Sequence, residues 1–296
     1  MKEPIFTGSA TALVTPYTET GVDFEKFKQL LDFQYANGTS AVIISGTTGE
    51  CCTQPVEEHA ALIDFACKYV AGRMKVVAGV GSNCTISAYE LACCAKDSGA
   101  DGILMVTPYY NKSTQRGLIA HYTYVADRVD IPIILYNVPS RTGIGFQAET
   151  YKALSSHPNI NGIKEASGNF SLLSRTRYLC GDDLWIWSGN DDDTLGMMAM
   201  GAIGVISVAS NIVPRAVADL CAQCLAGDFA AARATHMKYA DLFSRLFIET
   251  NPIPIKTAMN LLGWNVGKLR LPLVDMAPEN LEILKASLTN VGLELK

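Results

Sequence analysis

The stretch Asn161-Gly162-Ile163-Lys164-Glu165-Ala166-Ser167-Gly168 begins as a short apolar strand and ends in small polar residues that open a helix. Side chains alternate along a strand, so Gly162, Lys164 and Ala166 share one face. Two of these three residues are small, which predicts room around a long amine. Burial lowers the pKa of a lysine and frees a reactive amine near neutral pH. Lys164 is therefore either a buried structural cation or a nucleophile, and this stretch alone favours neither.

Length and composition predict a globular protein with a sizeable core. The chain has 296 residues, of which 49% are hydrophobic and 18% are charged. The net charge of -5 and the lack of a basic stripe argue against nucleic-acid binding. No apolar run reaches the roughly 20 residues that span a bilayer, and Met1-Lys2-Glu3-Pro4 lacks the apolar core of a signal peptide. We expect a soluble, cytoplasmic protein that binds neither nucleic acid nor membranes.

The nine cysteines are expected to be reduced thiols. Two adjacent pairs, Cys51-Cys52 and Cys93-Cys94, suit no usual disulfide framework. Cys221 and Cys224 have the spacing of metal ligands, but they fall in a predicted helix without a second ligand pair. We interpret these two as core residues and expect no metal site.

Apolar runs alternate with helical patterns eight times along the chain. The predicted strands are Ala10–Val14, Ala41–Ile44, Lys75–Ala78, Gly102–Val106, Ile133–Tyr136, the run that carries Lys164, Leu184–Trp187 and Gly204–Val208. This order predicts an α/β fold, a parallel (β/α)8 TIM barrel over residues 1–225, with residues 226–296 as a C-terminal helical appendage. A doubly wound open sheet is the alternative, but no Gly-x-Gly-x-x-Gly follows the first strand.

The carboxyl ends of barrel strands form the site in such folds, and the residues there are mostly hydroxyls, phenols, amides, one guanidinium and one amine. They are Thr47, Thr48, Tyr109, Tyr110, Tyr136, Arg141, Lys164, Gly189, Asn190 and Ser207. This set lacks the carboxylate pair of a glycosidase. The four histidines fall in helices or helix-to-strand loops, so a metal-dependent aldolase is not favoured.

A small carboxylate is the substrate that these groups favour. The acidic run Asp191 to Asp193, which we interpret as helix capping, argues against a phosphorylated substrate. Amides and hydroxyls of Gly46-Thr47-Thr48-Gly49 could hold one carboxylate, and Arg141 a second.

Each of these residues also has a structural interpretation. A tyrosine that ends a strand is often a packing residue, and an isolated arginine is often a surface cation. Lys75 and Lys256 are rival amines, although Lys75 begins its strand and Lys256 lies in the helical tail. The joint placement of an amine, a phenol and hydroxyls at one barrel end favours catalysis.

The chain resembles the dihydrodipicolinate synthase family, within the pyruvate-dependent lyases, nearly from end to end. The motifs that carry the resemblance are Phe6-Thr7-Gly8-Ser9, Gly46-Thr47-Thr48-Gly49-Glu50, Val106-Thr107-Pro108-Tyr109-Tyr110-Asn111, Leu135 to Gly143, Gly162 to Gly168, Asn251-Pro252-Ile253-Pro254 and Leu269-Arg270-Leu271-Pro272. The double threonine and Ser140-Arg141-Thr142-Gly143 favour the synthase over sialic-acid lyases and keto-deoxy-sugar-acid aldolases of the same fold.

The resemblance implies a lyase that condenses pyruvate with L-aspartate 4-semialdehyde on the diaminopimelate route to lysine. Lys164 would form the imine, Tyr136 would be the general acid/base, and Thr47 would relay protons to Tyr110 from a neighbouring subunit. Arg141 would bind the carboxylate of the semialdehyde, Thr48 would hold pyruvate, and Gly189 and Ile206 would line the pocket with backbone groups. No cofactor or metal would be needed, and the assembly would be a homotetramer of two tight dimers.

The resemblance also implies a position for a lysine effector at the tight-dimer interface. The matching residues are Cys51, Cys52, Val56, His59, Asn83, Ser87 and Tyr109. Ser87 stands where sensitive enzymes carry a glutamate, and Val56 replaces a histidine. One charge contact is therefore missing, and we expect lysine inhibition to be weak or absent.

Two other functions remain open at this stage. A related lyase could use an acyl sugar acid, and an assay of aldehyde specificity would separate it from the synthase. A catalytically silent barrel used for binding would be favoured if Lys164, Tyr136 or Thr47 were absent, and all three are present.

Overall fold

The structure, a computed structural model, describes residues 2–296. Eight parallel strands follow one another around a closed barrel, and β8 pairs with β1 to close it. This arrangement confirms the predicted (β/α)8 barrel. The strands are β1 (Gly8–Ala12), β2 (Ala41–Ile44), β3 (Lys75–Gly79), β4 (Gly102–Val106), β5 (Ile133–Asn137), β6 (Ile160–Glu165), β7 (Trp185–Ser188) and β8 (Gly204–Ser207).

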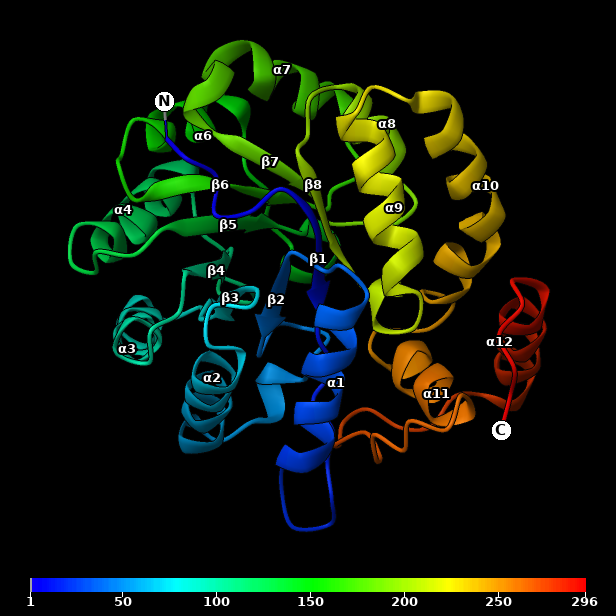
Figure 1. The fold of residues 1–296 in the computed structure, drawn as a ribbon. Helices are drawn as coiled ribbons and strands as arrows, with labels where there is room; N and C mark the ends of the chain where they lie inside the picture. Colours follow the sequence, from blue (N-terminus) through cyan, green and yellow to red (C-terminus); the bar gives the residue numbers. More distant parts are fainter. Residues whose placement is uncertain (1) are drawn as a thin grey trace.

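The helices surround the strands, and the last three gather on one side of the barrel beyond α9 (Figure 1). Side chains that accept a hydrogen bond from a first-turn amide begin several of them, such as Asp23 and Asn169. The helices are α1 (Phe24–Ala36), α2 (Val56–Val70), α3 (Thr85–Asp97), α4 (Gln115–Ala126), α5 (Pro139–Thr142), α6 (Ala148–Ser155), α7 (Phe170–Cys180), α8 (Thr194–Ala199), α9 (Pro214–Leu225), α10 (Phe229–Arg245), α11 (Ile253–Leu261) and α12 (Pro278–Asn290), with 3₁₀ turns η1 (Cys51–Thr53), η2 (Gly181–Asp183) and η3 (Ala209–Asn211).

Two apolar layers hold the barrel together. One lies between the strands and the helices, and the other fills the barrel interior. In the interior, the ring of Phe6, which precedes β1, stacks on Trp187 with 4.9 Å between ring centroids. This stack fills part of the barrel interior.

The sequence predicts open space beside Lys164 at Gly162, and this prediction is wrong. A Cβ atom at Gly162 would lie 2.6 Å from Cζ3 of Trp187 and 2.4 Å from the carbonyl oxygen of Trp185. Because both distances are shorter than any ordinary contact, the glycine admits the indole ring of β7. The small residue therefore serves packing under the site.

Residues after α9 are not confined to the outside of the barrel. The segment 247–251, between α10 and α11, reaches the cavity at the carboxyl ends of the strands. The division of the chain at residue 225 stays a prediction. None of the helices within residues 2–296 combines the length and the apolar character that crossing a membrane requires.

Candidate active site

A cavity of about 770 Å³ opens at the carboxyl ends of the barrel strands. Its wall combines strand-end residues with the segment 247–251 from the C-terminal region. Seven of the ten strand-end residues singled out from the sequence lie at this wall: Thr47, Thr48, Tyr136, Arg141, Lys164, Gly189 and Asn190.

Lys164 lies on β6 between Tyr136 of β5 and Trp187 of β7, its register partners. Its side chain is buried, and Nζ lies 4.4 Å from the centroid of the Tyr136 ring. Burial lowers the pKa of Lys164 to about 7, and the Arg141 guanidinium acts in the same direction, whereas Asp191 opposes the change. Since an ordinary lysine has a pKa near 10.4, a large share of this amine is neutral and nucleophilic at neutral pH.

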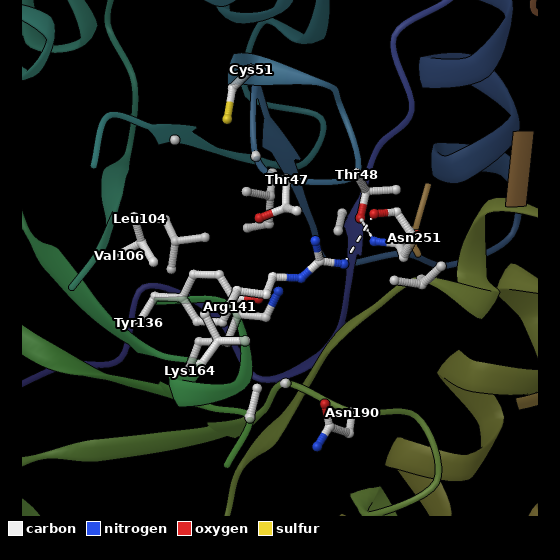
Figure 2. Close-up of a pocket in the computed structure, with 18 of the residues that line it drawn as sticks. Thr47, Thr48, Cys51, Leu104, Val106, Tyr136, Arg141, Lys164, Asn190 and Asn251 are labelled. Carbon is white, nitrogen blue, oxygen red and sulfur yellow. Dashed lines mark hydrogen bonds between the residues drawn. The ribbon is translucent and has the colours of Figure 1, made fainter. Parts of the chain in front are cut away.

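Tyr136 faces Thr47 across the cavity, with Lys164 beside it (Figure 2). Burial raises the pKa of the Tyr136 phenol above its ordinary value, while Arg141 and the Thr47 side chain moderate the rise. The phenol is therefore protonated at neutral pH and able to donate a proton to a bound oxygen. An amine with a proton donor beside it can carry out imine chemistry.

Arg141 comes from α5, a helix of one turn that the sequence analysis missed. Its guanidinium points into the cavity (Figure 2), where Nη2 donates to the carbonyl oxygen of Asn251 at 3.0 Å. Asn251 Nδ2 in turn donates to Thr48 Oγ1 at 3.0 Å. The remaining guanidinium N–H groups are available to a substrate carboxylate.

Asn251 is the main lining residue that sequence reasoning did not assign. It lies 203 positions from Thr48 along the chain and follows no barrel strand, so the rule of strand ends could not find it. Its place in a motif shared with the family was the available signal.

The sequence predicts that Asp191 caps a helix, and this prediction is wrong. It is buried and accepts hydrogen bonds from the Ser207 hydroxyl, from the Val208 N–H at 3.0 Å and from the Ala209 N–H at 2.9 Å. Helix α8 starts later, at Thr194, and Asp193 makes no side-chain capping bond. Asp191 therefore fixes the loop after β8, although burial raises its pKa.

Two of the residues to which the resemblance gives a catalytic or substrate-binding role are not among those that line the cavity. Tyr110 is 92% exposed and has a positive φ of 68°, and it is not among the residues that line the cavity. Ile206 is fully buried in the apolar layer inside the barrel, with Ala10 as its register partner, and its side chain does not line the cavity.

The residues expected to form an effector site have mixed surroundings. Cys51 lines the cavity and Cys52 is exposed, with 4.0 Å between their sulfur atoms. His59 Nε2 lies 2.7 Å from the Gly79 carbonyl oxygen. The remaining members are half-buried or, for Val56, exposed: Val56, Asn83, Ser87 and Tyr109.

The rival amines lie outside the cavity. Lys75 is exposed and pairs with Asp101 at 2.7 Å. Lys256 is buried and pairs with Glu50 at 2.8 Å. Within residues 2–296, no three His, Cys, Asp or Glu side chains are grouped so that they could hold a metal ion.

Comparisons with known proteins agree with this geometry. A model of the dihydrodipicolinate synthetase family matches residues 5–291. A 4-hydroxy-tetrahydrodipicolinate synthase from Thermoanaerobacter sp. (strain X514) is 50% identical over 291 residues, which cover 98% of each chain. The crystal structure of dihydrodipicolinate synthase from Aquifex aeolicus is 49% identical, with a TM-score of 0.96 over 98% of this chain and all of the other.

A third relative was crystallised with a ligand. The structure of a chloride-inhibited dihydrodipicolinate synthase from Acinetobacter baumannii complexed with pyruvate is 39% identical, covers 97% of this chain and 99% of its own, and has a TM-score of 0.95. With a family model across nearly its whole length and relatives at half identity, the chain belongs to the dihydrodipicolinate synthetase family.

Proposed function

We propose that this protein condenses pyruvate with L-aspartate 4-semialdehyde to form 4-hydroxy-tetrahydrodipicolinate, on the diaminopimelate route to lysine. The single observation that carries the proposal is the buried amine of Lys164, with its lowered pKa, inside a cavity that also contains Tyr136. Relatives at 46–50% identity that share the name 4-hydroxy-tetrahydrodipicolinate synthase support it.

The reaction begins on Lys164. Its neutral amine attacks the keto carbon of pyruvate, the keto oxygen leaves as water, and an imine forms. The imine withdraws electrons, so a methyl proton leaves and an enamine results. The enamine carbon then bonds to the aldehyde carbon of the semialdehyde, and attack of the semialdehyde amine on the imine carbon closes the ring and releases Lys164.

Protons in these steps pass through Tyr136. Its high pKa suits an acid that protonates the departing oxygen and the new alkoxide. Thr47 faces Tyr136 in the cavity, and we assign the proton relay to it. Thr48 holds the pyruvate carboxylate through its amide and hydroxyl, with Gly189 in the adjoining wall, and Arg141 holds the carboxylate of the semialdehyde.

Tyr110 supports an assembly of several copies. A tyrosine that is 92% exposed on a turn with positive φ is an unusual residue for a free surface. We assign it to the proton relay of a neighbouring copy in a homotetramer built from two tight dimers. The molar mass in solution, measured by light scattering, tests the assembly.

The proposed chemistry is tested by borohydride reduction in the presence of pyruvate, followed by mass mapping. The expected adduct is on Lys164, and Lys164→Ala abolishes it. An adduct on Lys256 would reject the site. Assays with L-aspartate 4-semialdehyde and with aldehydes derived from acyl sugar acids then test the second substrate.

The weak or absent lysine inhibition is part of the same proposal. Ser87 is half-buried and carries no charge, so it offers a lysine ammonium no ion pair. Half-maximal inhibition at sub-millimolar lysine in a titration would refute this expectation.

A further inference from the structure

Two sulfur atoms lie next to each other where the Thr47–Thr48 loop ends. Cys51 and Cys52 form the first two residues of η1, and their Sγ atoms are 4.0 Å apart. Cys51 lines the cavity, with its sulfur directed toward the cavity interior (Figure 2), and Cys52 is exposed. One thiol of the pair therefore lies at the cavity wall, and the other lies on the surface of the chain.

The turn that carries this pair is fixed at its start. Glu50 has a positive φ of 60°, and its carboxylate accepts from Lys256 Nζ at 2.8 Å and from the Arg270 N–H at 2.9 Å. Because the carboxylate is anchored on two sides, the backbone at Cys51 has little freedom to move. The turn therefore holds the two cysteines side by side at the edge of the cavity.

The distance between the sulfurs indicates what the pair can bind. A disulfide requires sulfurs about 2.05 Å apart, so oxidation would need an approach of roughly 2 Å in a fixed turn. A single soft centre with two bonds of about 2.3 Å can span two sulfurs up to roughly 4.6 Å apart, so a bridging atom needs much less movement of the side chains. The observed spacing fits a bridging atom and not a direct bond.

The protonation of the pair favours the same chemistry. The neighbouring Cys51 side chain lowers the pKa of the Cys52 thiol, and the Arg141 guanidinium lowers it further, while burial opposes both. The exposed thiol therefore loses its proton more readily than an ordinary cysteine thiol, and thiolates are the nucleophiles and the ligands for soft centres. The second thiol lies within reach to complete the ring.

The other cysteines provide a natural contrast. Cys93 and Cys94 are also adjacent, but they lie inside α3, where neighbouring residues do not face each other. Cys221 and Cys224 are buried, and burial raises the pKa of both thiols. Adjacency or spacing in sequence is therefore not enough to make a dithiol site.

We propose that Cys51 and Cys52 form a dithiol site that captures a thiophilic centre of the trivalent arsenical class, and that its occupation blocks the catalytic cavity. With a monosubstituted arsine oxide, two As–S bonds form and the arsenic–oxygen bonds break. The oxygen leaves as water with both thiol protons, and the oxidation state of arsenic does not change. The block of catalysis rests on the proposed function, whereas the capture does not.

Phenylarsine oxide added to the intact assembled protein tests both parts. Peptide mapping is expected to place one arsenical across Cys51 and Cys52, removable by a dithiol but not by a monothiol. Condensation activity is expected to fall at least about tenfold relative to untreated enzyme, since an occupied wall excludes substrate from a concave site.

Variants separate the pair from the other thiols. Cys51→Ser and Cys52→Ser, each compared with its own untreated sample, are expected to lose the dithiol-specific inhibition. The matched control, the double variant Cys93→Ser/Cys94→Ser, is expected to be inhibited like the parent.

An arsenical mapped to Cys93 and Cys94, or no bridged adduct at all, would overturn the site. A bridged adduct at Cys51 and Cys52 with undiminished activity would overturn the block of the cavity. Failure of the proposed function is seen separately, as absence of a borohydride-trapped pyruvate adduct on Lys164 in untreated protein.

Discussion

Two buried lysines, one on β6 and one on α11, have opposite surroundings. Both have a pKa lowered chiefly by burial. Lys256 donates to Glu50 Oε1 at 2.8 Å and to the Lys268 carbonyl oxygen at 2.9 Å. Lys164 faces an open cavity, and its ammonium contact is the Tyr136 ring. Burial alone therefore does not make a lysine nucleophilic. The amine must also be reached by substrate, and its nitrogen must not be held as an ammonium by a carboxylate partner.

The paired lysine has a structural task near the same site. Its partner Glu50 also accepts from the Arg270 backbone, and the Arg270 side chain pairs with both carboxylate oxygens of Glu58 at 2.6 and 2.9 Å. These contacts join the C-terminal region to the turn that follows Thr47 and Thr48. Lys256 thus holds the loop that carries Thr47 and Thr48, which line the same cavity as Lys164.

Removing the unpaired amine is expected to have the largest effect. Lys164→Ala should lower condensation activity by about 10⁴-fold or more, because no second amine is among the residues that line the cavity. Steady-state kinetics with both substrates measures the loss. Unchanged folding by circular dichroism is the control, and turnover within tenfold of the parent would contradict the assignment.

Removing the hydroxyl of Tyr136 tests whether contact of Lys164 with the aromatic ring is sufficient for catalysis. Tyr136→Phe keeps the ring under Lys164 Nζ but removes the proton donor. We expect a loss of roughly 10²–10⁴-fold in kcat, the usual contribution of general acid/base catalysis. If the loss were below tenfold, the proton would have to pass through another group.

Removing the paired amine should reduce stability before it affects chemistry. Lys256→Met leaves the buried Glu50 carboxylate without its cation, which is expected to cost about 3–5 kcal/mol in the free energy of unfolding. Denaturant unfolding measures this cost. The matched control is Arg245→Met at the exposed pair with Asp241, where the expected cost is below about 1 kcal/mol. Equal costs at the two pairs would contradict the structural role of Lys256.

The smallest expected effect is a shift in pH dependence. The Lys164 amine loses its proton as pH rises through about 7, so the rate of pyruvate adduct formation should rise through that pH and then level off. Arg141 lowers the pKa of Lys164, so Arg141→Gln should move the midpoint upward. Borohydride trapping, stopped at fixed times at several pH values, measures the midpoint for the parent and for the variant. A lower midpoint in the variant would contradict the predicted effect of Arg141 on the pKa of Lys164.

Strong local patterns made most of the barrel predictable. Strands β2 and β4 have the boundaries that the apolar pattern predicted. Helix α5 was missed because a helix of four residues is too short to show periodicity, although a proline at its first position is a typical start signal.

The first strand shows a limit of the same pattern. We predicted Ala10–Val14, and β1 is Gly8–Ala12. Leu13 and Val14 are buried, but the Val14 N–H bonds to the Asn211 side chain rather than to a neighbouring strand. Apolar character reports burial and does not distinguish a strand from a buried loop.

The sequence by itself determined the alternation of strands and helices and the placement of an amine, a phenol and hydroxyls at strand ends, because these depend on local periodicity. Only the tertiary structure decided that Asn251 reaches Thr48, that Asp191 holds the loop after β8, that an indole fills the space at Gly162, and that Lys256 is paired while Lys164 is not. The physical reason is that these contacts join residues far apart in the chain, and their distances exist only once the barrel has closed.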